Sequence, residues 1–200
     1  VSLGPNSSLT YQRNFTKAAL REVWAKGDIK FNVKHLNQNP QQIKNGETFI
    51  VHLDNKIAVE VLGTVFTVNN RRGQTSVALL SGSVKVTKDQ AQILLKPGQS
   101  VATNNQKALQ LNAQPTQQVV RDWQAQMVTL NRTSVQQIIN LLEDSYGIKL
   151  KVENPHILRK EIDGVLPLND QEKALQILTS ITNTNVQEKE SMYLLKEVKP

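Results

Sequence analysis

The chain has 200 residues, of which 38% are hydrophobic and 20% charged, and it contains no cysteine. This length and apolar content suit one large or two small domains with buried cores. The lack of cysteine excludes disulfides, thiolate catalysis and zinc–thiolate sites, and no apolar run reaches the roughly 18 residues that a membrane helix needs. Because Val1 begins directly in strand-like sequence without a signal segment, we expect an ectodomain taken from a longer protein.

The net charge of +7 is unevenly distributed. Residues 1–122 hold 15 lysines and arginines against 7 aspartates and glutamates, whereas residues 123–200 hold 9 against 10. A basic segment can indicate nucleic-acid binding. Here the cations are spread along alternating positions, and aromatic residues, at 4% of the chain, are too few to stack on bases. We therefore expect a solvated basic face and no nucleic-acid partner.

Residues 1–112 have the period of short β-strands separated by turn residues, with no credible long helix. The first strands are expected at Val1–Leu3, Ser8–Tyr11, Arg21–Trp24, Ile29–Val33, Thr48–Leu53 and Lys56–Leu62. Alternation continues around Val65–Val68, Val77–Leu79, Val84–Val86 and Ile93–Leu95, with turns at Gly73, Gly82 and Pro97-Gly98. Many short strands with frequent turns predict an all-β domain, an antiparallel sandwich or roll.

A polar stretch around Pro115 predicts a linker at residues 113–122. Trp123 follows directly, and we expect it to pack at the junction of two domains.

Residues 123–200 are predicted to form a small α+β domain with two βαβ-like halves. In the first half, Thr133 or Ser134 caps a helix, Gln136 or Gln137 makes the reciprocal contact, and Gly147 ends the helix before the strand Ile148–Val152. In the second half, the strand Ile162–Leu166 precedes a helix that starts at Asn169 or Asp170, with Glu172 as capping partner. Asn185–Lys189 and Met192–Glu197 are predicted to form a closing hairpin.

Several motifs of the first domain occur in a specific order. They are Val61-Leu62-Gly63-Thr64 with Phe66 and Val68, then Gly82-x-Val84-x-Val86, then Leu95-x-Pro97-Gly98-Gln99. This order resembles the periplasmic domain of the ferric-citrate-regulator (FecR) family. The later elements Trp123, Tyr146-Gly147, Gly164 and the helix around Ala174–Leu178 resemble the C-terminal part of Bacteroidetes members, a part similar in fold to the secretin and TonB N-terminal domain.

The resemblance implies that the chain is the periplasmic receiver region of a transmembrane anti-sigma factor. A TonB-dependent outer-membrane transporter would present its signalling domain to this region. A cytoplasmic segment and a single span of the inner membrane, both absent from this chain, would connect it to an extracytoplasmic-function sigma factor. The alternative is a carbohydrate-binding or adhesion β module of the cell envelope, which would need an exposed aromatic platform.

Residues that could support catalysis or bind a metal are scattered. His35, His52 and His156 are far apart and lack metal-ligand spacing, and no nucleophile or phosphate-binding motif is present. We therefore predict that the chain is not an enzyme and holds no metal or cofactor.

The partner-binding candidates lie on two predicted strands. Glu161, Asp163 and Val165 lie on or next to the strand Ile162–Leu166, which could be a sheet edge where a partner strand adds. Tyr193 and Leu194 lie on the last strand, which must be either paired inside its sheet or offered at an edge.

Overall fold

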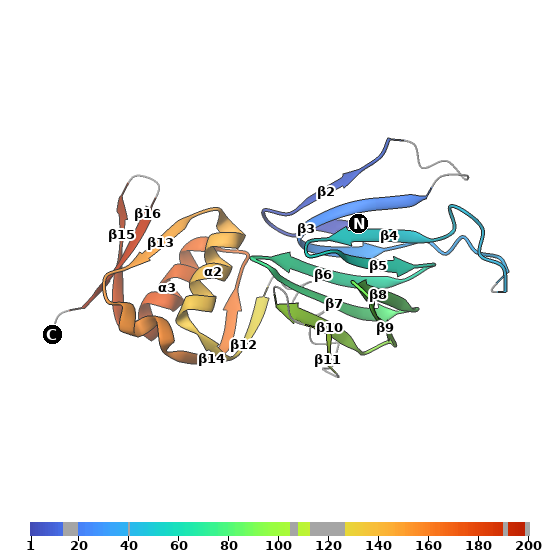
Figure 1. Ribbon diagram of the computed structural model, residues 1–200. Coiled ribbons are helices and arrows are strands. Elements are labelled where there is room, and N and C mark those ends of the chain that lie inside the picture. Colours follow the sequence, from blue (N-terminus) through green and yellow to red (C-terminus); the bar gives the residue numbers. More distant parts are fainter. Residues whose placement is uncertain (14–19, 40, 105–107, 113–126, 190–191, 199–200) are drawn as a thin grey trace. The chain divides into compact units, whose positions relative to one another are not determined.

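The computed structural model describes residues 1–13, 20–39, 41–104, 108–112, 127–189 and 192–198 (Figure 1). The chain divides into two compact units, Val1–Val120 and Arg121–Pro200, here called the first and second units. Within the described ranges, neither α-helix has the length and apolar character that crossing a bilayer requires.

The described part of the first unit is built from strands. They are β1 (Ser2–Leu3), β2 (Ser8–Tyr11), β3 (Arg21–Asn32), β4 (Phe49–Leu53), β5 (Ile57–Val61), β6 (Val65–Arg71), β7 (Gln74–Ser81), β8 (Val84–Lys88), β9 (Ala91–Leu95), β10 (Ser100–Asn104) and β11 (Gln110–Asn112). The strand order is β11-β10-β7-β6-β3-β4-β5-β8-β9, with β1 and β2 also paired to β3. All these pairs are antiparallel except β3 with β4, which is parallel.

One hydrophobic core lies inside this sheet. Buried and less buried residues alternate along β3, β5 and β8, as in β5, where Ile57, Val59 and Val61 are buried. Leu95 and Val101 belong to the same buried cluster, although β9 is the last strand at one end of the strand order and β10 is the second strand from the other end. The sheet therefore closes over its core, and the predicted all-β fold of mostly antiparallel strands is confirmed.

The two strands predicted at Arg21–Trp24 and Ile29–Val33 are in fact one strand of 12 residues. Gly27, which falls between these two predicted strands, lies in the middle of β3 with a φ of +91°. A Cβ at this position would lie 2.3 Å from Ser7 Oγ, so only glycine lets the two segments approach. β3 is continuous because β4 pairs with its first half and β6 with its second half.

The second unit contains two α-helices, one short 3-10 helix and five strands in its described residues. In chain order they are β12 (Met127–Ser134), α2 (Val135–Tyr146), β13 (Lys149–Val152), η1 (Pro155–Arg159), β14 (Glu161–Pro167), α3 (Gln171–Thr182), β15 (Thr184–Lys189) and β16 (Met192–Glu197). β12 pairs with β14, and β13-β16-β15 form a second sheet. The predicted small α+β fold is confirmed, and Figure 1 shows its two helices beside the strands.

The helix ends follow the predicted capping chemistry with one exception. Ser134 caps α2 in a reciprocal capping box with Gln137, and Gly147 ends the helix in the left-handed conformation. Asp170 caps α3 as predicted, but Glu172 is not its capping partner. The carboxylate of Asp170 accepts from the backbone N–H of Lys173. Lys173 occupies the position from which a glutamate would reach back, and Glu172 lies one residue before it.

Candidate protein-interaction surfaces

The strand β14 carries three of the predicted partner-binding residues, Glu161, Asp163 and Val165. Among the described residues β14 pairs only with β12, so one of its edges carries no further strand (Figure 1). An unpaired edge presents backbone N–H and C=O groups to which another chain can add.

Glu161 and Asp163 bind Arg132 of the neighbouring strand β12. Arg132 Nε donates to Glu161 Oε2 at 2.9 Å, and the backbone N–H of Arg132 donates to Asp163 Oδ1 at 2.7 Å. Arg132 has a φ of +45° and lies where the β12–β14 register shifts. The two carboxylates therefore stabilise a β-bulge, a role that the sequence pattern did not reveal.

Beyond the bulge, the β12–β14 ribbon exposes apolar groups. Val165 is 50% exposed and lies opposite Thr129, while Met127, near the start of β12, is 38% exposed. Between Asp163 and Val165, Gly164 has no atom within 4 Å of the place where a Cβ would stand. An extended partner segment can therefore come close to the backbone here.

Tyr193 and Leu194 lie on β16, the central strand of its sheet. β13 pairs with β16 on one side and β15 on the other, so the β16 main chain has no free edge for strand addition. Tyr193 packs against the core of the second unit, and its hydroxyl accepts from Gln171 Nε2 at 3.2 Å. The free edges of this sheet belong to β13 and β15.

Trp123 and the predicted linker at residues 113–122 lie outside the described residues.

The glycines of the first-unit motifs allow close backbone packing. A Cβ on Gly63 would lie 2.4 Å from His35 Cβ, and one on Gly82 would lie 2.7 Å from the Gly63 carbonyl oxygen. Thr64 is 3% exposed, and its hydroxyl donates to the Ser83 carbonyl at 3.0 Å. The motif thus joins the segments around residues 35, 63 and 82 and has a structural role.

A mainly apolar hollow of about 440 Å³ lies beside this junction. Its lining includes the exposed side chains Ile43 and Leu94 and the ion pair of Lys85 with Glu60, whose charged atoms are 2.5 Å apart. The loop that contains Ile43 is held by Glu47, whose Oε2 accepts from Asn37 Nδ2 and from the Lys44 N–H, each at 2.7 Å. These hydrogen bonds lower the pKa of Glu47.

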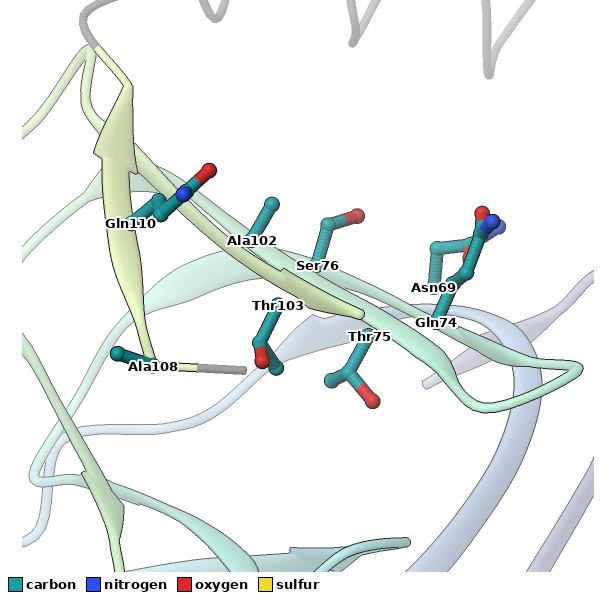
Figure 2. A pocket seen from close by; sticks show the side chains of 8 residues that line it. All are labelled: Asn69, Gln74, Thr75, Ser76, Ala102, Thr103, Ala108 and Gln110. Atoms are coloured by element: carbon teal, nitrogen blue, oxygen red, sulfur yellow. The ribbon is translucent and has the colours of Figure 1, made fainter. Parts of the chain in front are cut away.

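A second hollow, of about 390 Å³, is lined mainly by amides and hydroxyls (Figure 2). Asn69, Ser76, Ala102 and Gln110 form a row across β6, β7, β10 and β11, because each is the register partner of the next. The lining side chains that the structure describes are not titratable, and their amides and hydroxyls can form hydrogen bonds.

Trp24 is the one tryptophan among the described residues, and it is 43% exposed on β3. Its ring stacks on His52 of β4 with ring centroids 5.1 Å apart, and His52 Nε2 lies 3.6 Å from Glu22 Oε2. The alternation of β3 shows why Trp24 is exposed: Val23 and Ala25, on either side, are buried.

The three histidines lie on different parts of the chain: His35 follows β3, His52 is in β4 and His156 is in η1. Among the described residues, no group of three or more His, Asp or Glu side chains could hold a metal ion.

Comparison with known families identifies both parts of the chain. The sequence model described as FecR protein matches residues 1–85, and that described as FecR, C-terminal matches residues 127–194. No curated protein sequence matches the chain.

Two solved structures share the fold. Both are crystal structures of a candidate anti-sigma factor from Parabacteroides distasonis, with TM-scores of 0.78 and 0.77 and 23% sequence identity. Each comparison covers 98% of this chain and 89% of the other.

Proposed function

This chain belongs to the FecR family and has the FecR C-terminal domain, and we propose that it is the periplasmic receiver region of a transmembrane anti-sigma factor. In this role it takes a signal from a TonB-dependent outer-membrane transporter. It relays that signal to an extracytoplasmic-function sigma factor through a membrane span and a cytoplasmic segment outside this sequence.

The observation that carries the proposal is the match of two FecR models in order along one chain, at residues 1–85 and 127–194. The fold shared with a candidate anti-sigma factor over 98% of this chain supports it.

The transporter's signalling domain is expected to dock on the β12–β14 ribbon. β14 offers an unpaired edge in the described part of the chain, and Val165 and Met127 provide exposed apolar contacts beside it. A strand that adds to such an edge gains main-chain hydrogen bonds, while its side chains select the partner. Glu161 and Asp163 contribute by holding the bulge at Arg132 in place.

Calorimetric titration with the signalling domain of the transporter encoded beside this gene tests the proposal. We expect Val165→Asp to weaken binding at least tenfold, because a carboxylate replaces an apolar contact that would be desolvated. Val186→Asp is the matched control, since Val186 is 39% exposed on another edge strand, β15. Circular dichroism checks that both variants are folded.

The outcomes separate the site from the function. If Val186→Asp weakens binding and Val165→Asp does not, the docking site is on the β13-β16-β15 sheet. If the parent chain binds no signalling domain from its own gene neighbourhood, the receiver function itself is wrong.

A carbohydrate-binding module is a second candidate function, favoured by one observation. Trp24 presents a half-exposed indole on a sheet surface, next to the polar side chains of His52 and Glu22. Sugar rings can pack on such a surface while polar neighbours bind their hydroxyls. Titration with soluble oligosaccharides, followed by tryptophan fluorescence in the parent and in Trp24→Ala, tests this candidate. A saturable change in fluorescence that Trp24→Ala abolishes would support it. No fluorescence change in the parent would exclude it.

A further inference from the structure

The first two strands form a strap along β3. β1 pairs Ser2 and Leu3 with Lys30 and Ile29, and β2 pairs Ser8–Tyr11 with Val23–Lys26. Figure 1 shows β2 lying alongside β3. We call residues Ser2–Tyr11 the strap.

The turn between β1 and β2 is held by one arginine, Arg71 at the end of β6. Arg71 Nε donates to Asp28 Oδ2 at 2.8 Å, and its two Nη atoms donate to the carbonyl oxygens of Pro5 and Asn6 and to Ser7 Oγ. The Arg71 side chain is only 15% exposed, so these charge-assisted contacts are partly shielded from water.

Asp28 and Ser7 complete the clamp. Ser7 Oγ accepts from the Asp28 N–H at 2.9 Å, and the Gly4 N–H donates to the Asp28 carbonyl at 2.7 Å. Gly27 leaves the space that Ser7 fills. Side-chain and main-chain groups of one short turn thus converge on β3 and β6.

Outside this turn, the strap buries little apolar surface. Leu3 and Tyr11 are 50% and 58% exposed, and the side chain of the strap that packs against the core of the first unit is Leu9, which is partly buried. The apolar contact of the strap with the core is therefore made by Leu9, and the clamp supplies charge-assisted hydrogen bonds.

We propose that the strap is releasable, and that β3 is a strand-accepting site which the strap closes and the Arg71 clamp keeps shut. When the clamp opens, the ligand of this site is an extended polypeptide segment that pairs with the β3 main chain from Val23 to Lys30. Such a segment carries an apolar residue at the position of Leu9, because that side chain meets the core. When a partner segment replaces the strap, the main-chain hydrogen bonds to β3 are kept. The clamp contacts therefore account for most of the free-energy difference between the strap-bound and the partner-bound states.

Hydrogen exchange measured on the whole chain tests the release. In Arg71→Ala we expect backbone amides of the strap to exchange at least tenfold faster than in the parent, while amides of β5 and β8 keep their protection. Lys85→Ala is the control. It also removes a cation from an ion pair, here with Glu60, but it leaves the clamp intact. Ser7→Ala, a milder change, should accelerate the same amides by a smaller factor if Arg71→Ala does not fold.

A peptide with the sequence of residues 1–12, labelled with a fluorophore, tests the accepting site by anisotropy. It should bind Arg71→Ala at least tenfold more tightly than the parent, and the same peptide with Leu9→Asp should bind neither. If exchange in Arg71→Ala accelerates uniformly throughout the first unit, or stays unchanged in the strap, the proposal that the strap is releasable is wrong. A peptide that binds both chains equally or neither would overturn the accepting site.

Discussion

At the scale of single residues, glycines and polar side chains explain where chain segments approach most closely. Gly63 has no room for a side chain because the backbone and side chain of His35 lie against it. Glu161 and Asp163, which the sequence offered as partner-binding groups, are engaged by Arg132. Their contribution to binding, if the β12–β14 ribbon is the docking site, comes from the shape of the bulge that they hold.

Gly63→Ala should destabilise the first unit by about 1–3 kcal/mol, the usual cost of forcing extra volume into a packed site. The added methyl would stand 2.4 Å from His35 Cβ and 2.6 Å from His35 Cα, so the backbone itself must move. Urea unfolding followed by circular dichroism measures the loss. Ser81→Ala, at the exposed end of β7, is the control, and an unchanged midpoint in Gly63→Ala would contradict the close packing.

At the scale of elements, local chemistry determines helix ends, and long-range pairing determines the place of each strand. α2 begins just after Ser134 and ends just before Gly147, because a hydroxyl acceptor and a left-handed residue at these caps satisfy terminal backbone groups of the helix. Local sequence does not determine the position of β16 between β13 and β15, because the apolar run of β16 fits a central strand and an edge strand equally well.

Ser134→Ala should lower the stability of the second unit by about 1 kcal/mol, because the N-cap hydroxyl that accepts from the Gln137 N–H is lost. Thermal unfolding of the whole chain measures the effect. Ser180→Ala makes the same chemical change at an exposed position inside α3 and should not destabilise. Equal effects of the two substitutions would show that the cap does not stabilise α2.

At the scale of the whole molecule, the two units have separate hydrophobic cores. The core of the first unit gathers residues of β3 to β10, including Phe31 and Phe66, whose rings stack at 4.8 Å. The core of the second unit is formed by α2, α3 and strands of both its sheets, including Leu142 and Leu178. Each unit therefore has its own source of stability.

Leu142→Ala, which truncates a fully buried side chain, should destabilise the second unit by about 2–5 kcal/mol. Hydrogen exchange should then accelerate in residues 127–198 and stay unchanged in the first unit. Phe66→Ala should have the opposite pattern, with faster exchange confined to the first unit. Loss of protection in both units after either substitution would show that the cores unfold together.

The sequence by itself determined the all-β and α+β character of the two parts, most strand and helix positions, and the helix end at Gly147. It narrowed each N-cap to two neighbouring residues, Thr133 or Ser134 and Asn169 or Asp170. These features depend on the spacing of apolar residues and on groups within a few positions of one another. Only the tertiary structure decided that β3 is one strand across Gly27, that β3 and β4 are parallel, that β16 is central and that Arg132 binds Glu161 and Asp163. These depend on contacts between residues far apart in the chain, which a local period does not specify. The predicted boundaries at residues 112 and 123, and the junction role of Trp123, stay predictions.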